Sequence, residues 1–314
     1  MIERIAQRFE PKLRQALLDS WDYLRKSFSE KQIVSALDRA GVIGVMDLFD
    51  SLGGGFNDAF QANIEQALGE SGRISVGLLP KGAIVSATQP FTLFNANTVQ
   101  AINNYTSTMI KEIKNSTRDA IRQSLHDDII SGQHPVSTAR NFRSNIGLTQ
   151  KQYQAVDNYR KYLESGDITA LKRNLRDKRS DNVIRRAIEG NKKLPKDKID
   201  KLVNRYREKF IKHRAEVIAR TESLRAVSIG HHQAMLQLKE QGALNFNLRR
   251  FWIVANDERL RPAHKAIPGL NPIGRNINEP FVTPLGPLMY PRDPSGTADN
   301  TVQCRCRIIY KVVK

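Results

Sequence analysis

Cysteine is scarce in this chain of 314 residues, and long apolar runs are missing. The two cysteines, Cys304 and Cys306, are separated by one residue, which on a strand gives poor geometry for a bond between them. We therefore expect no disulfide framework, and the low count suits a reducing cytoplasm. The longest uncharged stretch, residues 82–110, is rich in Ser, Thr, Asn and Gln, and residues 1–30 carry charges throughout. We expect neither a membrane span nor a secretory signal.

Several motifs that define common active sites are also missing. The sequence has no glycine-rich phosphate loop, no G-x-S-x-G elbow and no H-E-x-x-H helix. It has no helix-turn-helix, zinc finger or aromatic stacking pattern either, so recognition of base sequence is not expected. His231 and His232 are adjacent on a predicted helix and point in different directions, so we do not expect them to chelate together. No cofactor is predicted.

Positive charge is what the chain has in excess, with 50 Lys and Arg against 32 Asp and Glu and a net charge of +18. Residues 1–170 sum to +1, residues 171–215 to +11 and residues 216–314 to +6. A charge run is often only the solvated face of a helix, but a block this local also favours a polyanion. Contacts to phosphates give binding that is independent of sequence. The side chains that we expect to contact double-stranded DNA are Lys172, Arg173, Arg176, Lys178, Arg179, Arg185, Arg186, Lys192, Lys193, Lys196, Lys198, Lys201 and Arg205.

Apolar residues recur at steps of three and four through most of the chain, which predicts helices. Residues 1–70 are expected to form a helical region and residues 96–170 a second helical region. Between them, glycines and prolines interrupt short β-branched runs, so residues 71–95 are predicted to be a linker or a small hairpin. Apolar positions continue through residues 171–215, so this block is predicted to be a folded basic helical segment.

Local signals place several helix ends. Pro11 predicts a break or kink in the first helix, and the three glycines at residues 53–55 predict the end of the second. Asn95 or Asn97 is the expected start of a helix of about 35 residues, about 50 Å long. Thr149 is a predicted N-cap.

After Gly242 the pattern changes to that of strands, in LRRFWIVA, FVTPLGPLMYP and CRCRIIYKVV. Residues 216–314 are therefore predicted to form a small C-terminal α+β domain, with its sheet packed on a long helix. The fold class that we predict is α+β and mainly α, with a long-helix N-terminal region followed by this small domain.

Polar side chains gather just after the first of these strands, at Asp257, Arg259, Arg261 and His264. One interpretation is a metal-independent nuclease or toxin-like enzyme, with His264 as the general base and the arginines on the phosphate. The other is a structural clamp of ion pairs and hydrogen bonds, which we favour because no second acid or base has a distinctive spacing. The residues expected in this polar clamp are Arg220, Glu222, Asp257, Arg259, Arg261, His264, Asp293 and Arg305.

Two local alternatives remain open in this region. Glu222 lies three residues before Arg225, so an ion pair along the helix is the simpler account of that carboxylate. A metal site can be drawn from Cys304, Cys306, His264 and Asp257, but a one-residue spacing is not the two-residue loop that chelates zinc well. On an alternating strand, both cysteines fill the apolar face as small core residues. We favour the core role and keep the cysteines as candidate ligands.

Six elements in a fixed order give the C-terminal region its character. They are IARTE at 218–222, W-x4-D-x-R-x-R-x2-H at 252–264, Phe281, YPRDP at 290–294, Asn300 and the CRC of 304–306. This order resembles the Mu F-like head morphogenesis family of tailed phages, the minor head or minor capsid proteins. The motifs cover about residues 215–310.

The resemblance implies a virion protein in few copies at the portal vertex, inside the capsid, and in the host cytoplasm during assembly. It implies the portal protein as a partner, which we expect helical residues 96–170 to contact, with the major capsid or scaffolding protein as further candidates. The implied role is head assembly and DNA packaging or delivery, without enzymatic activity and without a membrane. The alternatives are the nuclease centred on His264 and a nucleic-acid-binding protein outside any phage.

Overall fold

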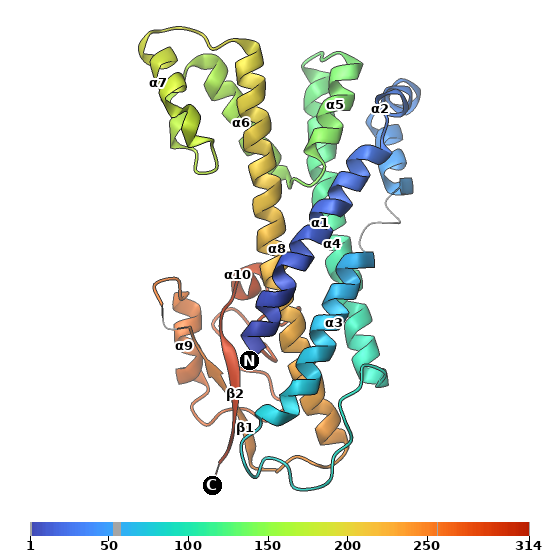
Figure 1. Ribbon diagram of the computed structural model, residues 1–314, viewed down its shortest axis with the longest axis vertical. Coiled ribbons are helices and arrows are strands. Elements are labelled where there is room, and N and C mark those ends of the chain that lie inside the picture. The colour runs from blue at the N-terminus through green and yellow to red at the C-terminus, as the bar shows by residue number, and fades with distance from the viewer. Residues whose placement is uncertain (1, 53–57, 256, 314) are drawn as a thin grey trace. The chain divides into compact units, whose positions relative to one another are not determined.

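The computed structural model describes residues 2–52, 58–255 and 257–313 and is mainly helical (Figure 1). A two-stranded antiparallel sheet completes the described part, so the predicted α+β, mainly α class is confirmed. The helix end predicted at residues 53–55 lies outside the described residues. The helices are α1 (Ile2–Ser27), α2 (Glu30–Leu52), α3 (Asp58–Ser75), α4 (Ala96–Ile130), α5 (Pro135–Asn145), α6 (Gln150–Ser165), α7 (Asp181–Glu189), α8 (Lys196–Glu240), α9 (Pro262–Leu270) and α10 (Ala298–Thr301).

The chain divides into two compact units. Unit 1 contains residues 1–15, 58–108 and 216–314, and unit 2 contains residues 16–57 and 109–215. Helices α1, α4 and α8 each contribute residues to both units. Residue 216, the predicted start of the C-terminal domain, therefore lies within a helix of 45 residues. No helix among the described residues combines the length and apolar content of a membrane span.

Unit 2 has an aromatic core and well-defined helix starts. Phe28 packs edge-on against Phe142 with ring centroids 5.2 Å apart and stacks on Phe49 at 6.0 Å. Helix α6 begins with a capping box, in which the Thr149 hydroxyl accepts from the backbone N–H of Gln152 and the Gln152 side chain accepts from the Thr149 N–H. This confirms the predicted N-cap, because the pattern depends only on neighbouring residues.

The basic segment was predicted to be helical throughout, but its first part forms no α-helix. Short 3-10 turns, η3 (Ile168–Lys172) and η4 (Lys178–Ser180), precede α7. An aspartate caps each turn: Asp167 accepts from the backbone of Thr169 at 2.7 Å, and Asp177 accepts from the backbone of Arg179 at 3.3 Å. Such side-chain caps offer the backbone an alternative to helix, which explains the difference.

In unit 1, helices α3 and α8 approach closely at Gly230. A Cβ at this position would lie 2.2 Å from the carbonyl oxygen of Leu68, so only glycine fits without a shift of the backbone. Nearby, the Ser71 hydroxyl donates to the Val227 carbonyl at 2.7 Å. Helix α1 continues through Pro11, so of the predicted break or kink the break does not occur. The buried Phe9 and Leu13 lie on either side of the proline and offset the lost hydrogen bond.

Residues 71–95 hold the end of α3, a 3-10 turn η2 (Val76–Leu78) and an extended loop, with no hairpin. Ile84 in this loop forms a β-bridge with Leu244 instead. The next helix, α4, starts as predicted, because the Asn95 side chain accepts from the backbone N–H groups of residues 97 and 98 at 3.0 and 3.2 Å. Here the asparagine satisfies donors that would otherwise lack partners.

The sheet joins strands β1 (Leu248–Ile253) and β2 (Arg307–Val312), which pair from Leu248↔Val312 to Ile253↔Arg307. The strand predicted in FVTPLGPLMYP is reduced to a single bridge between Phe281 and Leu288, since the turn at Thr283–Gly286 intervenes. The strand predicted from Cys304 begins only at Arg307. Gln303 has a left-handed backbone with φ of 55°, which interrupts the extended chain just before the cysteines.

Two adjacent buried histidines on α8 make unit 1 sensitive to acid. Burial, with the nearby Arg250 cation, lowers the pKa of His231 to about 4 and of His232 to about 3. Both rings stay neutral in the folded chain, whereas the unfolded chain binds protons below its ordinary pKa of about 6.5. The neutral histidines therefore cost no stability above about pH 6.5. Below it, the free energy of unfolding falls by about 1.4 kcal/mol per pH unit for each histidine as the pH drops towards 4.

Urea unfolding at about pH 7 and about pH 5 measures this loss. We expect His232→Phe, which keeps a ring against Tyr290, to remove close to half of the acid sensitivity. His126→Phe changes an exposed histidine of α4 and is the control, which should leave the sensitivity unchanged. Equal pH dependence in all three proteins would contradict this account.

Candidate functional site

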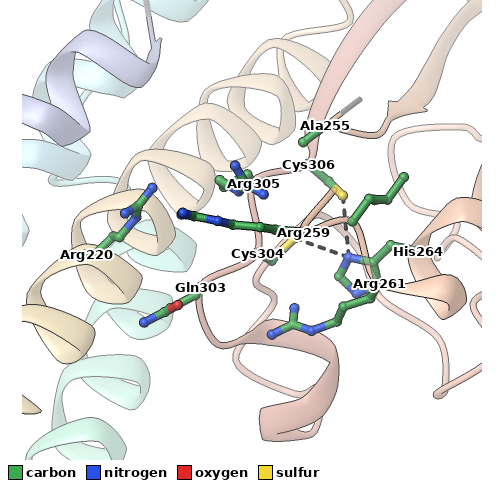
Figure 2. Close-up of a pocket in the computed structure, with 10 residues that line it drawn as sticks. Arg220, Ala255, Arg259, Arg261, His264, Gln303, Cys304, Arg305 and Cys306 are labelled. Atoms are coloured by element: carbon green, nitrogen blue, oxygen red, sulfur yellow. Dashed lines mark hydrogen bonds between the residues drawn. The ribbon is translucent and has the colours of Figure 1, made fainter. Parts of the chain in front are cut away.

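Three side chains converge on one point in unit 1: His264, Cys304 and Cys306 (Figure 2). The histidine lies in the first turn of α9, and the cysteines lie between α10 and β2. The Nδ1 atom of His264 is 3.6 Å from the sulfur of Cys304 and 3.5 Å from that of Cys306. Each of the three residues is 2% exposed. The sulfurs share an apolar core with residues that include Trp252 and Phe281.

The histidine ring is oriented by an amide. Its Nε2 is 3.0 Å from the side-chain oxygen of Asn300, whose amide nitrogen in turn donates to the Thr283 hydroxyl at 3.0 Å. Because Asn300 presents its oxygen to the ring, Nε2 carries the proton and donates it. This bond fixes the ring plane with Nδ1 facing the two sulfurs.

The cysteines are positioned by a buried arginine. Arg292 donates from one guanidinium nitrogen to the carbonyl oxygens of Cys304 and Cys306, at 2.7 and 2.9 Å, and from another to the Ser228 hydroxyl at 2.7 Å. It has a left-handed backbone with φ of 70°. Since these carbonyls are occupied by side-chain donors, the segment turns its sulfurs inward together. The sequence motif YPRDP contains this arginine, but nothing in the sequence pointed to its role.

The pKa values in the cluster differ from ordinary ones. A hydrogen bond from the Cys306 side chain, with the contact to His264 and the Arg292 cation, lowers the pKa of Cys304. The hydrogen bond to Cys304, together with burial, raises the pKa of Cys306. The Cys304 sulfur raises the pKa of His264. The cluster therefore favours a negative charge on sulfur next to the imidazole.

Arginines surround the cluster on its open side. Arg220, Arg259 and Arg305, together with His264 and both cysteines, line a cavity of about 120 Å³ (Figure 2). Among the described residues, no hydrogen bond or ion pair involves the guanidinium groups of Arg220 and Arg259. Their positive charges therefore face this cavity, and that of Arg259 also interacts electrostatically with the Asp257 carboxylate.

The structure brings together only part of the predicted polar clamp. Asp257 forms an ion pair with Arg305, which holds the pKa of that carboxyl below its usual range, and Arg261 donates to the Val302 carbonyl. Glu222 has different partners: it accepts from Arg225 at 2.8 Å and from the Tyr105 hydroxyl.

Asp293 also lies apart from the clamp. It accepts from the backbone N–H groups of Met289 and Ser295 at 2.7 and 2.9 Å, which fold its own loop.

Arg250 is a buried polar residue that the sequence interpretation missed. It is 1% exposed and donates to the carbonyls of Asn276, Glu279 and Met289. The signal was present in the strand pattern, because β1 is buried at alternate positions and Arg250 falls between Leu248 and Trp252 on the buried face. An arginine on that face must have its hydrogen bonds satisfied inside the protein.

His264 is poorly placed to act as the general base of a nuclease. The ring is buried, Nε2 is engaged with Asn300, and Nδ1 faces sulfur atoms. A general base needs a nitrogen within hydrogen-bond reach of the proton that it abstracts. The geometry gives the metal-independent enzyme no support.

The basic segment belongs to unit 2, and its side chains divide into two groups. Some of the predicted DNA contacts are already paired: Arg176 with Asp181 at 2.8 Å, and Arg179 and Arg205 with Asp177 at 2.9 and 3.1 Å. Lys201 lies 3.7 Å from Asp197, and Arg173 donates to the Tyr206 hydroxyl. The remaining predicted contacts form no ion pair among the described residues; these are Lys172, Lys178, Arg185, Arg186, Lys192, Lys193, Lys196 and Lys198.

Fold and site together define a mainly helical protein in which a small antiparallel sheet and a buried Cys-His cluster lie in one compact unit. Residues 168–309 match the family model described as Phage Mu protein F like protein. The resemblance carried by the ordered motifs is thereby confirmed for this region, and phage head morphogenesis is the role that the family indicates. The match begins ahead of those motifs and includes the basic segment. Comparison with curated proteins and with solved structures gives no significant match.

Proposed function

We propose that this protein is a minor head protein that lies at the portal vertex of a tailed phage and contacts both the portal protein and packaged DNA. The observation that carries the proposal is the family match over residues 168–309, which includes both the C-terminal motifs and the basic segment. A head morphogenesis role implies contact with other head proteins and a place in the virion. The family is a structural one, which is compatible with the absence of turnover.

The DNA contact is supported by the cations of residues 171–215 that no carboxylate neutralises. Arg186, Lys192, Lys193 and Lys196 are exposed and unpaired among the described residues, on α7, the following loop and the start of α8. Unpaired Lys and Arg displace counterions from DNA without reading its sequence. This segment therefore contacts the phosphate backbone, and its affinity depends strongly on salt.

Replacement of these four residues by alanine tests the DNA contact. We expect affinity for double-stranded DNA of arbitrary sequence to fall at least about tenfold at moderate salt, and the slope of log K against log salt to lessen by about 0.9 for each lost contact. The control replaces four exposed lysines elsewhere, Lys31, Lys81, Lys239 and Lys265, and removes the same charge. Equal losses in both variants would show that only net charge matters and would contradict a local site.

The portal contact is tested separately. We expect the full chain to co-purify with the portal protein of the same phage when the two are expressed together, in the presence of nuclease so that DNA cannot bridge them. The four-alanine variant should co-purify as well as the unchanged chain, because the proposed portal contact lies in residues 96–170. Absence of the complex under these conditions would remove the portal part of the proposal and leave the DNA part standing.

A further inference from the structure

The spacing of the His264, Cys304 and Cys306 ligand atoms fits a tetrahedral metal ion. With Zn–S bonds of about 2.3 Å, Zn–N bonds of about 2.0 to 2.1 Å and an angle of about 109°, a sulfur and a nitrogen on one zinc lie about 3.5 to 3.6 Å apart. The observed separations from Nδ1 are 3.6 Å to Cys304 and 3.5 Å to Cys306. All three ligand atoms lie within 4.8 Å of one another.

A hydrogen bond to Nδ1 accounts for only one of these two sulfurs at its short distance from the ring. Nδ1 has a single in-plane direction, along which it either accepts one S–H or, when protonated, donates one N–H. Two sulfurs at nearly equal distance cannot both use that direction. A cation placed between the three atoms interacts with all of them at once, with the lone pair of Nδ1 and with both thiolates.

The surroundings match those of a zinc ligand set. Metal-bound histidines donate their second ring N–H to an acceptor that fixes the tautomer, and here Nε2 donates to Asn300. The one-residue spacing places both sulfurs on one side of an extended chain, and Arg292 fixes this segment by donating to the carbonyl oxygens of both cysteines. Arg292 therefore holds the two cysteines in place without the two-residue loop that usually separates zinc-binding cysteines in a sequence.

We propose that His264, Cys304 and Cys306 bind one zinc ion in unit 1, with the fourth coordination position open to the arginine-lined cavity. Thiolate and imidazole ligands in a tetrahedral arrangement favour zinc over hard cations such as Mg²⁺ or Ca²⁺. Asp257 is not a ligand, because it is paired with Arg305. The cysteines are therefore ligands, in contrast to the core role favoured from their spacing.

Metal content of the full chain is the first test. We expect about one zinc per chain after purification or after titration of the chelator-treated protein with zinc. Cobalt is the spectroscopic probe, since a cobalt–thiolate bond gives a charge-transfer band that nitrogen and oxygen ligands do not produce. Removal of zinc should lower the melting temperature, because the ion binds the folded state.

Variants assign the ligands. Cys304→Ser, Cys306→Ser and His264→Ala should each lose zinc, and each cysteine variant should weaken the cobalt–thiolate band. His126→Ala removes an exposed histidine of α4 and should retain the full metal content. Absence of both bound zinc and a thiolate band in the unchanged protein would overturn the proposal, whether or not the variants fold. Retention of zinc by both cysteine variants would overturn it equally.

Discussion

Arg250→Ala is expected to destabilise unit 1 by about 3–5 kcal/mol, because three buried carbonyls lose a charged hydrogen-bond donor. The side chain is 1% exposed, and its guanidinium donates to the carbonyls of Asn276, Glu279 and Met289. Alanine would leave these acceptors without a donor in the interior, at about 1–3 kcal/mol for each group that water cannot reach. It would also remove the contact with the Phe281 ring at 5.1 Å.

Urea unfolding followed by the fluorescence of Trp252 measures this effect. Trp252 lies on β1 two residues from Arg250, and Trp21→Phe removes the other tryptophan from the signal. Arg249→Ala is the matched control, because Arg249 is the neighbouring arginine and has no ion pair or side-chain hydrogen bond among the described residues; we expect a change within about 0.5 kcal/mol. Similar losses in the two variants would show that charge, not the buried network, stabilises the strand.

Glu222→Ala is the second substitution with a large expected effect, about 3–5 kcal/mol. The carboxylate is buried and accepts from Arg225 at 2.8 and 3.1 Å and from the Tyr105 hydroxyl. Arg225 also donates to the Arg292 carbonyl at 2.9 Å, so the network connects α8 to the loop that positions the cysteines. Loss of the Glu222 carboxylate would remove its ion pair with a guanidinium whose side chain is 12% exposed.

Two variants separate the charge from the hydrogen bonds. Glu222→Gln keeps the shape and one acceptor, so its loss should be smaller than that of alanine. Glu216→Ala changes an exposed glutamate on the same helix, whose only ion pair among the described residues is with Arg14 at 3.7 Å, and should cost less than about 1 kcal/mol. A Glu222→Ala protein as stable as Glu216→Ala would contradict the buried network. If the zinc site is also present, Glu222→Ala should lose zinc at a lower temperature than the unchanged chain.

Features that depend on neighbouring residues were predictable from the sequence. The start of α4 at Asn95 and the cap at Thr149 follow from side chains that bond to backbone groups two or three residues away. The mainly helical class followed from apolar periodicity, and the pairing of Glu222 with Arg225 from their spacing on one helix. The cap at Asp177 is also a local feature, but it was not predicted, because the charges and apolar positions of this segment pointed to a continuous helix.

The candidate site was only partly predictable, because its parts come from distant segments. The residues were recognised as a polar group, yet His264 and the cysteines are about 40 positions apart, and their approach depends on Arg292 and Asn300. The left-handed backbone at Gln303 lies just before CRCRIIY, and the strand that this alternation predicts begins only at Arg307. The one-residue spacing of the cysteines therefore argued against a metal site, whereas the distances from Nδ1 of His264 to the two sulfurs support one.

The passage of α1, α4 and α8 through both units affects where this protein can be divided. A recombinant fragment limited to residues 168–309 would contain the family motifs but omit residues 58–108 of unit 1. Those residues include Leu68, which packs at Gly230, and Tyr105, which bonds to Glu222. The fragment would expose one side of α8 to water. A boundary drawn from sequence similarity thus separates residues that pack together in unit 1, and fragments for expression are better designed to retain α3 and the first part of α4.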